Sequence, residues 1–128
     1  MQILLEPAVK KETVAHQASG FHLLLTLKSC AAEILNDKNK LEELTWRAAI
    51  ATGATVMQIC SQQFKPQGVT AIAVLAESHA SLHTYPESNT VFWDCFTCGT
   101  ECKPELSVSV LVEALKPETF SKEIIYRH

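Results

Sequence analysis

The sequence predicts an α+β fold, namely a two-layer sandwich in which an antiparallel sheet carries helices on one face. Strand-like apolar runs and helix-like periodicities follow one another in the order strand, helix, hairpin, strand, helix and a last strand. The length of 128 residues matches one domain, and 47% hydrophobic with 20% charged residues is ordinary globular composition. We therefore divide the chain into an N-terminal extension, residues 1–19, and a single domain, residues 20–128.

The first part of the domain is predicted to hold a strand and then a helix. Residues 21–27 are a short apolar run after Gly20, which is typical of a strand. Asn36 and Asp37 are good residues to cap the start of a helix. The chain after them repeats apolar side chains at helical spacing: Leu41, Leu44 and Ala48. Gly53 suits the position just beyond the end of this helix.

A β-hairpin is predicted to follow the helix. Residues 55–64 and 69–76 are two strand-like runs. Between them, residues 65–68 carry Pro66 and Gly68 at the positions that a type I turn favours. The second run is continuously apolar, which favours a central strand that is covered on both faces or packed at an interface.

The last third of the chain is predicted to hold a strand, a helix and a short final strand. Residues 77–87 are dense in polar groups, and no strand is predicted there, whereas residues 91–98 are apolar and aromatic. Pro104 suits the first turn of a second helix. The apolar stripe of that helix has four members: Val108, Leu111, Val112 and Leu115. Lys116-Pro117 ends it, and residues 124–126 form the last predicted strand.

Charge and cysteine content exclude several classes of protein. A net charge of −3 and a pI of about 5.9 argue against nucleic acid and anionic membranes as partners, because both require a basic patch. No apolar run approaches the roughly 20 residues that span a bilayer, and residues 1–10 lack the pattern of a secretory signal. Five cysteines, an odd number, do not make a disulfide framework. We therefore expect a cytoplasmic protein with reduced thiols.

Most of the chemically informative side chains lie within residues 77–102. Three cysteines there have a spacing that resembles a set of metal ligands: Cys95, Cys98 and Cys102. His79 and His83 could complete a zinc site, but closed zinc sites take four ligands, usually from two paired knuckles, and there is no second Cys-x-x-Cys. A redox pair of Cys95 and Cys98 is a further alternative, although such pairs usually open a helix and this one ends a strand. We predict no metal.

A longer sequence motif indicates the function more specifically than any of these residues alone. Ala-Glu-Ser-His-Ala-Ser-Leu-His-Thr-Tyr-Pro-Glu at residues 76–87, followed by Phe-Thr-Cys-Gly at residues 96–99, resembles the prokaryotic-type S-adenosylmethionine decarboxylases, which are pyruvoyl enzymes made as proenzymes. The likeness extends upstream to three further motifs: Gly20-x-His22, Gly53-Ala54-Thr55 and Phe64-x-Pro66-x-Gly68-Val69. It covers about residues 20–115 and implies the sandwich fold of that family.

The resemblance implies that the chain cleaves itself between Glu77 and Ser78, giving a β chain of residues 1–77 and an α chain of residues 78–128. The Ser78 hydroxyl would attack the Glu77 carbonyl and turn the amide into an ester. Removal of the Ser78 α-proton and β-elimination would then free residues 1–77 and leave a dehydroalanine. The dehydroalanine would tautomerise and be hydrolysed with loss of ammonia, which gives a covalent pyruvoyl group, the cofactor, at the new N-terminus. By the same resemblance, His83 is the base in this processing. Thr70, which replaces a serine of the family, could assist it.

The implied activity is conversion of S-adenosylmethionine to decarboxylated S-adenosylmethionine, the aminopropyl donor for spermidine biosynthesis. The pyruvoyl keto group forms a Schiff base with the substrate and withdraws electrons as carbon dioxide leaves. Cys98 matches the proton donor of the family, and a thiol is a competent donor. Phe64 and His83 match the pair that stacks on adenine, and Glu87 matches the acid that holds the ribose. A homodimer of cleaved protomers with sites at the interface is implied as well.

Several positions depart from the family pattern. They lie where substrate-pocket walls are expected: Thr26, Lys28, Gln62-Gln63, Ser88 to Thr90 and Phe92-Trp93. None of these changes removes Ser78, His83 or Cys98, so the chemistry looks intact while the pocket differs. Two alternatives therefore stay open. One is a pyruvoyl-dependent ornithine or arginine decarboxylase of the same family, and the other is an inactive, unprocessed dimerisation partner.

Overall fold

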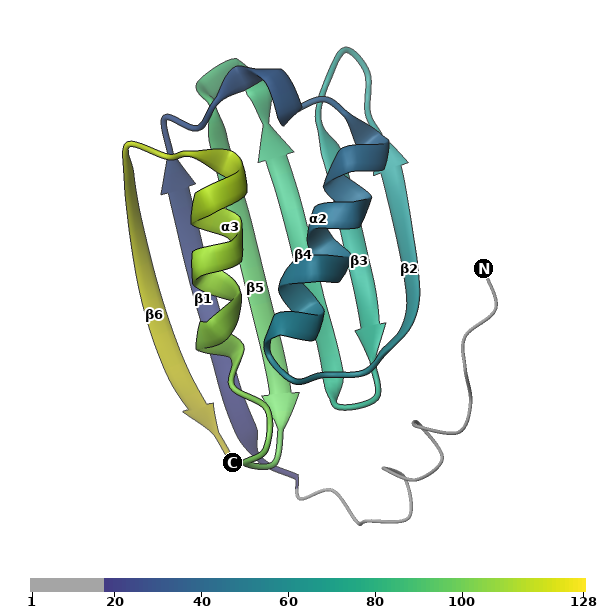
Figure 1. Cartoon of the computed structure of the whole chain (residues 1–128), viewed down its shortest axis with the longest axis vertical. Coiled ribbons are helices and arrows are strands. Elements are labelled where there is room, and N and C mark those ends of the chain that lie inside the picture. Colours follow the sequence, from purple (N-terminus) through teal and green to yellow (C-terminus); the bar gives the residue numbers. More distant parts are fainter. Residues whose placement is uncertain (1–17) are drawn as a thin grey trace.

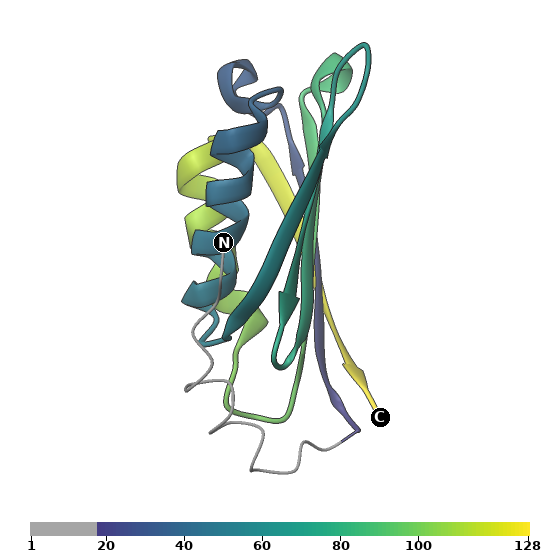
Figure 2. The ribbon, with the colours of Figure 1, turned by 90° about the vertical axis from the view of Figure 1, so that its right-hand side faces the viewer.

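A six-stranded antiparallel sheet with both helices on one face makes up the computed structural model, which describes residues 18–128 (Figures 1 and 2). The strands are β1 (Gly20–Lys28), β2 (Val56–Gln63), β3 (Val69–Leu75), β4 (Ser78–Tyr85), β5 (Thr90–Cys98) and β6 (Thr119–Arg127). The helices are α2 (Lys38–Ala51) and α3 (Ser107–Leu115). This confirms the predicted α+β sandwich, whereas most of the predicted N-terminal extension, residues 1–17, lies outside the described residues.

The order of strands across the sheet is β2-β3-β4-β5-β1-β6, and every neighbouring pair is antiparallel. Because side chains alternate along a strand, one sheet face packs under the helices and the other is left bare. The covered face holds the core, in which Leu23, Leu25 and Trp93 are at most 2% exposed. The Trp93 Nε1–H donates to Ser107 Oγ at 3.0 Å, which ties β5 to the start of α3.

The first helix forms as its sequence predicts. Asp37 caps α2 by accepting the Lys40 N–H on its carboxylate at 3.1 Å. The predicted apolar stripe is buried against the sheet: Leu41, Leu44 and Ala48. Gly53 lies beyond the helix end with φ +93°, a conformation that favours glycine. Among the described residues, no helix is long and apolar enough to cross a membrane.

The main error of the sequence prediction concerns residues 77–87. They were expected to lack a strand, but β4 runs through Ser78–Tyr85 in the interior of the sheet, paired with β3 and β5. Its polar side chains alternate with Ala80, Leu82 and Thr84, which face the helices and are buried. The sequence conceals this strand because three polar side chains lie on its other face: His79, Ser81 and His83.

Two smaller predictions also need correction, and a third keeps one of its two alternatives. The connection between β2 and β3 is not closed by the hydrogen bond of a type I turn, since the Gly68 N–H donates to Asn36 Oδ1 at 2.8 Å and not to the Lys65 carbonyl. Of the two alternatives for β3, coverage on both faces is not found within this chain, because Ile72 and Val74 are exposed on the bare face, and packing at an interface stays a prediction. The last strand is longer than the predicted residues 124–126.

Candidate active site

The predicted site residues fall into two groups at opposite ends of the sheet. At the lower end in Figure 1, Ser78 opens β4 and pairs with Thr97 of β5, next to Cys98. At the upper end, His83 pairs with Thr70 of β3. Ser78 and His83 are five residues apart on one strand, which separates them by about 17 Å. Within one chain, the structure therefore does not bring the predicted base to the predicted nucleophile.

The lower group surrounds the Glu77–Ser78 peptide bond. Ser78 has φ +148°, a backbone conformation that side-chain-bearing residues rarely adopt and that costs about 1–3 kcal/mol. The Glu77 side chain is buried, and its Oε1 accepts the Thr55 N–H at 3.0 Å. The Cys98 N–H donates to the Glu77 carbonyl oxygen at 2.9 Å. The bond that would be cut is thus strained on one side, anchored on the other, and polarised by a hydrogen bond on its carbonyl.

Two neighbours shape this end of the sheet further. Gly20 pairs with Cys98, and a Cβ at Gly20 would overlap the Thr97 carbonyl oxygen, so only glycine fits there. Directly opposite Ser78, the Thr97 hydroxyl is fully buried and has no hydrogen-bond partner among the described residues. A buried hydroxyl without a partner is unusual, because the large majority of buried polar side-chain atoms make a hydrogen bond.

The upper group is more open. His83 Nδ1 lies 3.0 Å from Thr70 Oγ1, so the predicted base and its predicted aid are in contact. Phe64 is 48% exposed in the connection between β2 and β3. Glu87 is exposed in a single 3₁₀ turn, Pro86–Ser88, after β4. Both therefore lie at the same end of the sheet as His83.

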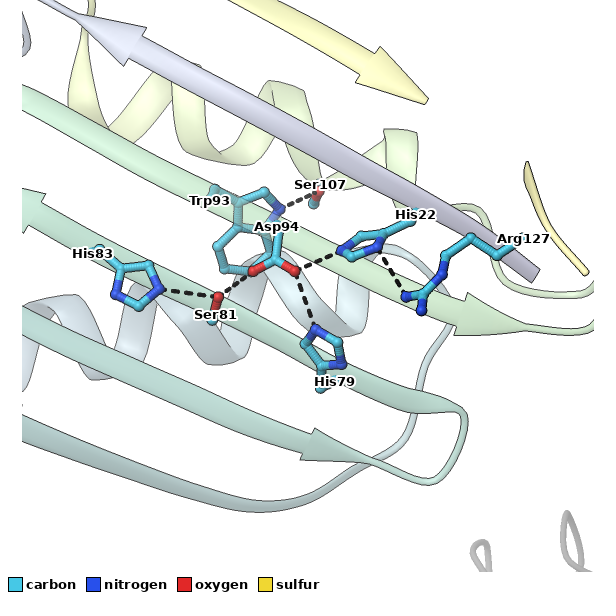
Figure 3. A network of polar contacts seen from close by, with 8 residues as sticks. All are labelled: His22, His79, Ser81, His83, Trp93, Asp94, Ser107 and Arg127. Atoms are coloured by element: carbon cyan, nitrogen blue, oxygen red, sulfur yellow. Dashed lines mark hydrogen bonds and ion pairs between the residues drawn. The ribbon is translucent and has the colours of Figure 1, made fainter. Parts of the chain in front are cut away.

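Between the two groups, a polar network crosses the bare face of the sheet (Figure 3). Asp94 of β5 is its centre: Oδ2 lies 2.6 Å from His22 Nε2 and 3.1 Å from His79 Nε2, and Oδ1 accepts the Ser81 hydroxyl. Desolvation by burial opposes the charge on Asp94. The hydrogen bonds from His79, Ser81 and His22 outweigh it and hold the pKa of Asp94 far below its usual value.

One triad in this network has the composition of a metal site. The ligand atoms of His22, His79 and Asp94 all lie within 4.8 Å of one another. However, Arg127 Nη1 lies 3.2 Å from His22 Nδ1, and a guanidinium can only donate. The neutral His22 ring must then carry its proton on Nε2 and donate it to Asp94. In this arrangement the Nε2 lone pair that a metal would need is not available.

The structure argues against both cysteine alternatives, the zinc site and the redox pair. Cys95 is fully buried on the helix face of β5, and alternation along the strand puts Cys98 on the bare face. Burial, with smaller contributions from the charges of Asp94 and Cys102, raises the pKa of Cys95 to about 12. Thiols on opposite faces of a strand cannot converge on one zinc ion or form a redox pair.

Sequence reasoning did not assemble this network. In the sequence, His79 is considered only as an alternative zinc ligand and His22 only as part of a motif, while Ser81 and Asp94 are only members of the segment 77–102. The usable signal was alternation: Ser81 and Asp94 lie opposite each other on neighbouring strands and share a face. That pairing requires β4 to be recognised as a strand, which the polar residues concealed.

The chain is similar to known proteins over most of its length. Residues 21–128 match the model of the S-adenosylmethionine decarboxylase family. A protein of Brevibacillus brevis named S-adenosylmethionine decarboxylase proenzyme is 40% identical over 107 residues, which cover 83% of this chain and 80% of that protein. One of the same name from Methanococcus maripaludis is 42% identical over 99 residues, or 77% and 81% of the two chains.

A solved structure shares the fold as well. The crystal structure of the adenosylmethionine decarboxylase from Aquifex aeolicus VF5 superposes with a TM-score of 0.77 at 30% sequence identity. The match covers 84% of this chain and 89% of that one. The family match extends over both groups of site residues and the network between them. This chain therefore belongs to the S-adenosylmethionine decarboxylase family.

Proposed function

We propose that this protein is a self-processing, pyruvoyl-dependent carboxy-lyase that decarboxylates S-adenosylmethionine in the cytoplasm and so supplies the aminopropyl donor for spermidine biosynthesis. The observation that carries the proposal is the strained Ser78 beside a polarised Glu77 carbonyl. Strain of this kind persists only where the surrounding structure enforces it, and it is concentrated at functional sites. The proenzyme names of the relatives support the same reading.

Self-cleavage would begin with the Ser78 hydroxyl attacking the Glu77 carbonyl carbon. The Cys98 N–H already donates to the carbonyl oxygen, where negative charge develops during the attack, so it acts as an oxyanion donor. The anchored Glu77 side chain holds the carbonyl in place. Breaking the Glu77–Ser78 amide also releases the backbone strain at Ser78. The ester that results is open to α-proton removal and β-elimination.

The residues around Ser78 fit a pyruvoyl group formed in place. A pyruvoyl group supplies a keto carbon that acts as an electron sink when a carboxylate leaves. The unpartnered Thr97 hydroxyl, opposite Ser78, is a donor for a new carbonyl oxygen at this position. Cys98, on the adjacent strand, carries the thiol that would donate a proton to the product. A reducing compartment such as the cytoplasm keeps that thiol in the form that can donate.

A dimer resolves the separation between Ser78 and His83. The bare sheet face carries large apolar side chains that are each 37–46% exposed: Leu24, Ile72, Val74, Tyr85, Phe92 and Ile125. Such a face is typical of a protein interface. Suppose that two copies pack these faces together about a two-fold axis that lies in the interface, perpendicular to the strands. The lower end of one sheet then lies over the upper end of the other. His83 and Thr70 of one copy then approach Ser78 of its partner.

The same arrangement would assemble the substrate site. Phe64 and His83 offer aromatic faces for adenine, and Glu87 offers a carboxylate for the ribose hydroxyls, all at the upper end. The keto group and Cys98 belong to the lower end. A nucleoside-sized substrate would therefore be held by one copy and decarboxylated on the other, in a pocket at the interface.

Two measurements test the proposal. Mass spectrometry of the purified protein should find two chains, with the second starting at a pyruvoyl group in place of Ser78. Carbon dioxide release should then be measured from S-adenosylmethionine, ornithine and arginine in parallel, and S-adenosylmethionine should be the preferred substrate. A single uncut chain would support the inactive-partner alternative, and preference for ornithine or arginine would reassign the substrate.

A further inference from the structure

Four side chains on three neighbouring strands form a continuous line of hydrogen bonds. Thr70 Oγ1 of β3 lies 3.0 Å from His83 Nδ1 of β4. On the other side of the ring, His83 Nε2 lies 3.2 Å from Ser81 Oγ, and the Ser81 hydroxyl donates to Asp94 Oδ1 of β5. Both ring nitrogens of His83 therefore have a defined polar partner, as Figure 3 shows on the Ser81 side.

The carboxylate of Asp94 determines which atoms in this line of hydrogen bonds carry a proton. A carboxylate can only accept, so the single Ser81 proton points to Asp94. Ser81 can then serve His83 only as an acceptor, which places the proton of the neutral ring on Nε2. The His83 Nδ1 is left with its lone pair, and it accepts the Thr70 hydroxyl.

We propose that Ser81 and Asp94 are positioning residues that hold His83 in the tautomer whose Nδ1 is the proton acceptor in self-cleavage. This rests on the proposed role of His83 as the processing base. A histidine acts as a base only through an unprotonated nitrogen, and the hydrogen bond at its other nitrogen decides which one that is. Ser81 makes that bond, and Asp94 ensures that Ser81 accepts in it, because Asp94 takes the Ser81 proton.

The residues around Asp94 keep the Ser81 hydroxyl donating to its carboxylate. Its Oδ2 is occupied by two further donors, from His22 and His79. Arg127 donates to the far side of His22 and so orients that ring toward Asp94. An amide in place of the carboxylate would put its oxygen toward these two donors and its NH₂ group toward Ser81. Ser81 would then turn its proton to His83 Nε2, and the ring would carry its proton on Nδ1.

The test uses the full-length precursor and follows cleavage by mass spectrometry, with and without hydroxylamine. Ser81→Ala and Asp94→Asn should each cleave at least about tenfold more slowly, because general-base catalysis contributes about 10²–10⁴-fold. Since attack by Ser78 precedes the step that needs the base, the ester should accumulate in both variants. Hydroxylamine attacks that ester, leaving a hydroxamate on Glu77 and an α chain that begins with an intact Ser78. Its mass differs from that of the pyruvoyl form.

Two controls separate positioning from general loss of structure. Ser81→Thr keeps the hydroxyl and should cleave at close to the parental rate. Ser61→Ala removes a different serine-to-carboxylate bond, from Ser61 Oγ to Glu42 Oε2 at 2.6 Å, and should leave the rate unchanged. Release of fragments by hydroxylamine itself reports that the cleavage site of a slow variant is folded.

Three outcomes would overturn the positioning role: parental cleavage in Ser81→Ala and Asp94→Asn, a Ser81→Thr variant as slow as Ser81→Ala, or slow variants that hydroxylamine does not cut. Failure of the proposed function looks different. It would appear as fragments from Ser78→Ala, or as a parent protein that never cleaves.

Discussion

Backbone strain at one residue, Ser78, marks the proposed cleavage point. Its φ of +148° is a conformation that glycine adopts freely, because the strain comes from the Cβ atom. Ser78→Ala keeps that atom and removes the nucleophile, whereas Ser78→Gly removes both. Neither variant should cleave, and Ser78→Gly should be the more stable of the two by about 1 kcal/mol. Thermal unfolding of the two precursors makes the comparison, and a more stable Ser78→Ala would show that the strain is not borne by Ser78.

The two contributions of Cys98 can be separated because one is made by its backbone and one by its side chain. Cys98→Ala keeps the N–H that donates to the Glu77 carbonyl, so cleavage should proceed at close to the parental extent. It removes the thiol, so release of decarboxylated product should fall by at least about 10²-fold, the usual contribution of an acid–base group. Both are measured on one preparation, by mass spectrometry and by product assay. Normal turnover in a cleaved Cys98→Ala protein would exclude the thiol as proton donor.

At the scale of the strand, β4 shows how far the sequence alone reaches. The flanking elements were predictable, because α2 has a cap and an apolar stripe, and β3 and β5 are apolar runs. The interior polar strand was not, since His79, Ser81 and His83 occupy its bare face and conceal the alternation with Ala80 and Leu82. Polar side chains on a central strand are expected only where that face of the sheet forms a functional site.

The same limit applies to the site. Motif resemblance identifies Ser78, His83 and Cys98, but it does not show that Ser78 and His83 belong to opposite ends of one strand. Once β4 is a strand, five residues separate them by about 17 Å. The partners of His83 depend on strand register, which no single segment of sequence specifies.

A close approach between strands makes a further prediction for β1. Gly20 packs against the Thr97 carbonyl and the Cys98 Cα, so Gly20→Ala must push β1 away from β5 at the site. The free energy of unfolding should fall by about 1–3 kcal/mol, as for other overpacked positions. Urea unfolding in a Ser78→Ala background measures this without interference from cleavage. Lys28→Ala, at the exposed far end of the same strand, is the control and should change stability by less than about 0.5 kcal/mol.

At the scale of the whole molecule, the topology predicts that cleavage leaves the protomer intact. Residues 1–77 supply β1, β2, β3 and α2, while residues 78–128 supply the other elements. Because β1 lies between β5 and β6, the two fragments interleave in one sheet, and β3 also pairs with β4. They should elute together in size-exclusion chromatography under native conditions and separate only in denaturant. The Ser78→Ala precursor supplies the elution volume for comparison, and separate native elution of the fragments would contradict the interleaved sheet.

The last prediction concerns the dimer. If an active site is shared across a two-fold axis, two chains with different defects can complement each other in a mixed dimer. A Ser78→Ala chain cannot be cut but keeps His83, and a His83→Ala chain keeps Ser78 but lacks its own base. Alone, the first should stay whole and the second should cleave poorly. Co-expressed, they should form a mixed dimer in which His83 of the first chain serves Ser78 of the second.

Cleavage of the His83→Ala chain should therefore recover only in the mixture, toward about half of the His83→Ala chains, because about half of them pair with a Ser78→Ala chain when equal amounts combine at random. Mass spectrometry distinguishes the two chains by the masses of their substitutions. The separation of about 17 Å within one protomer requires this result if His83 is the base. Recovery that is absent in a mixed dimer, or efficient cleavage of the parent as a monomer in analytical ultracentrifugation, would mean that a base within the same chain reaches Ser78 instead.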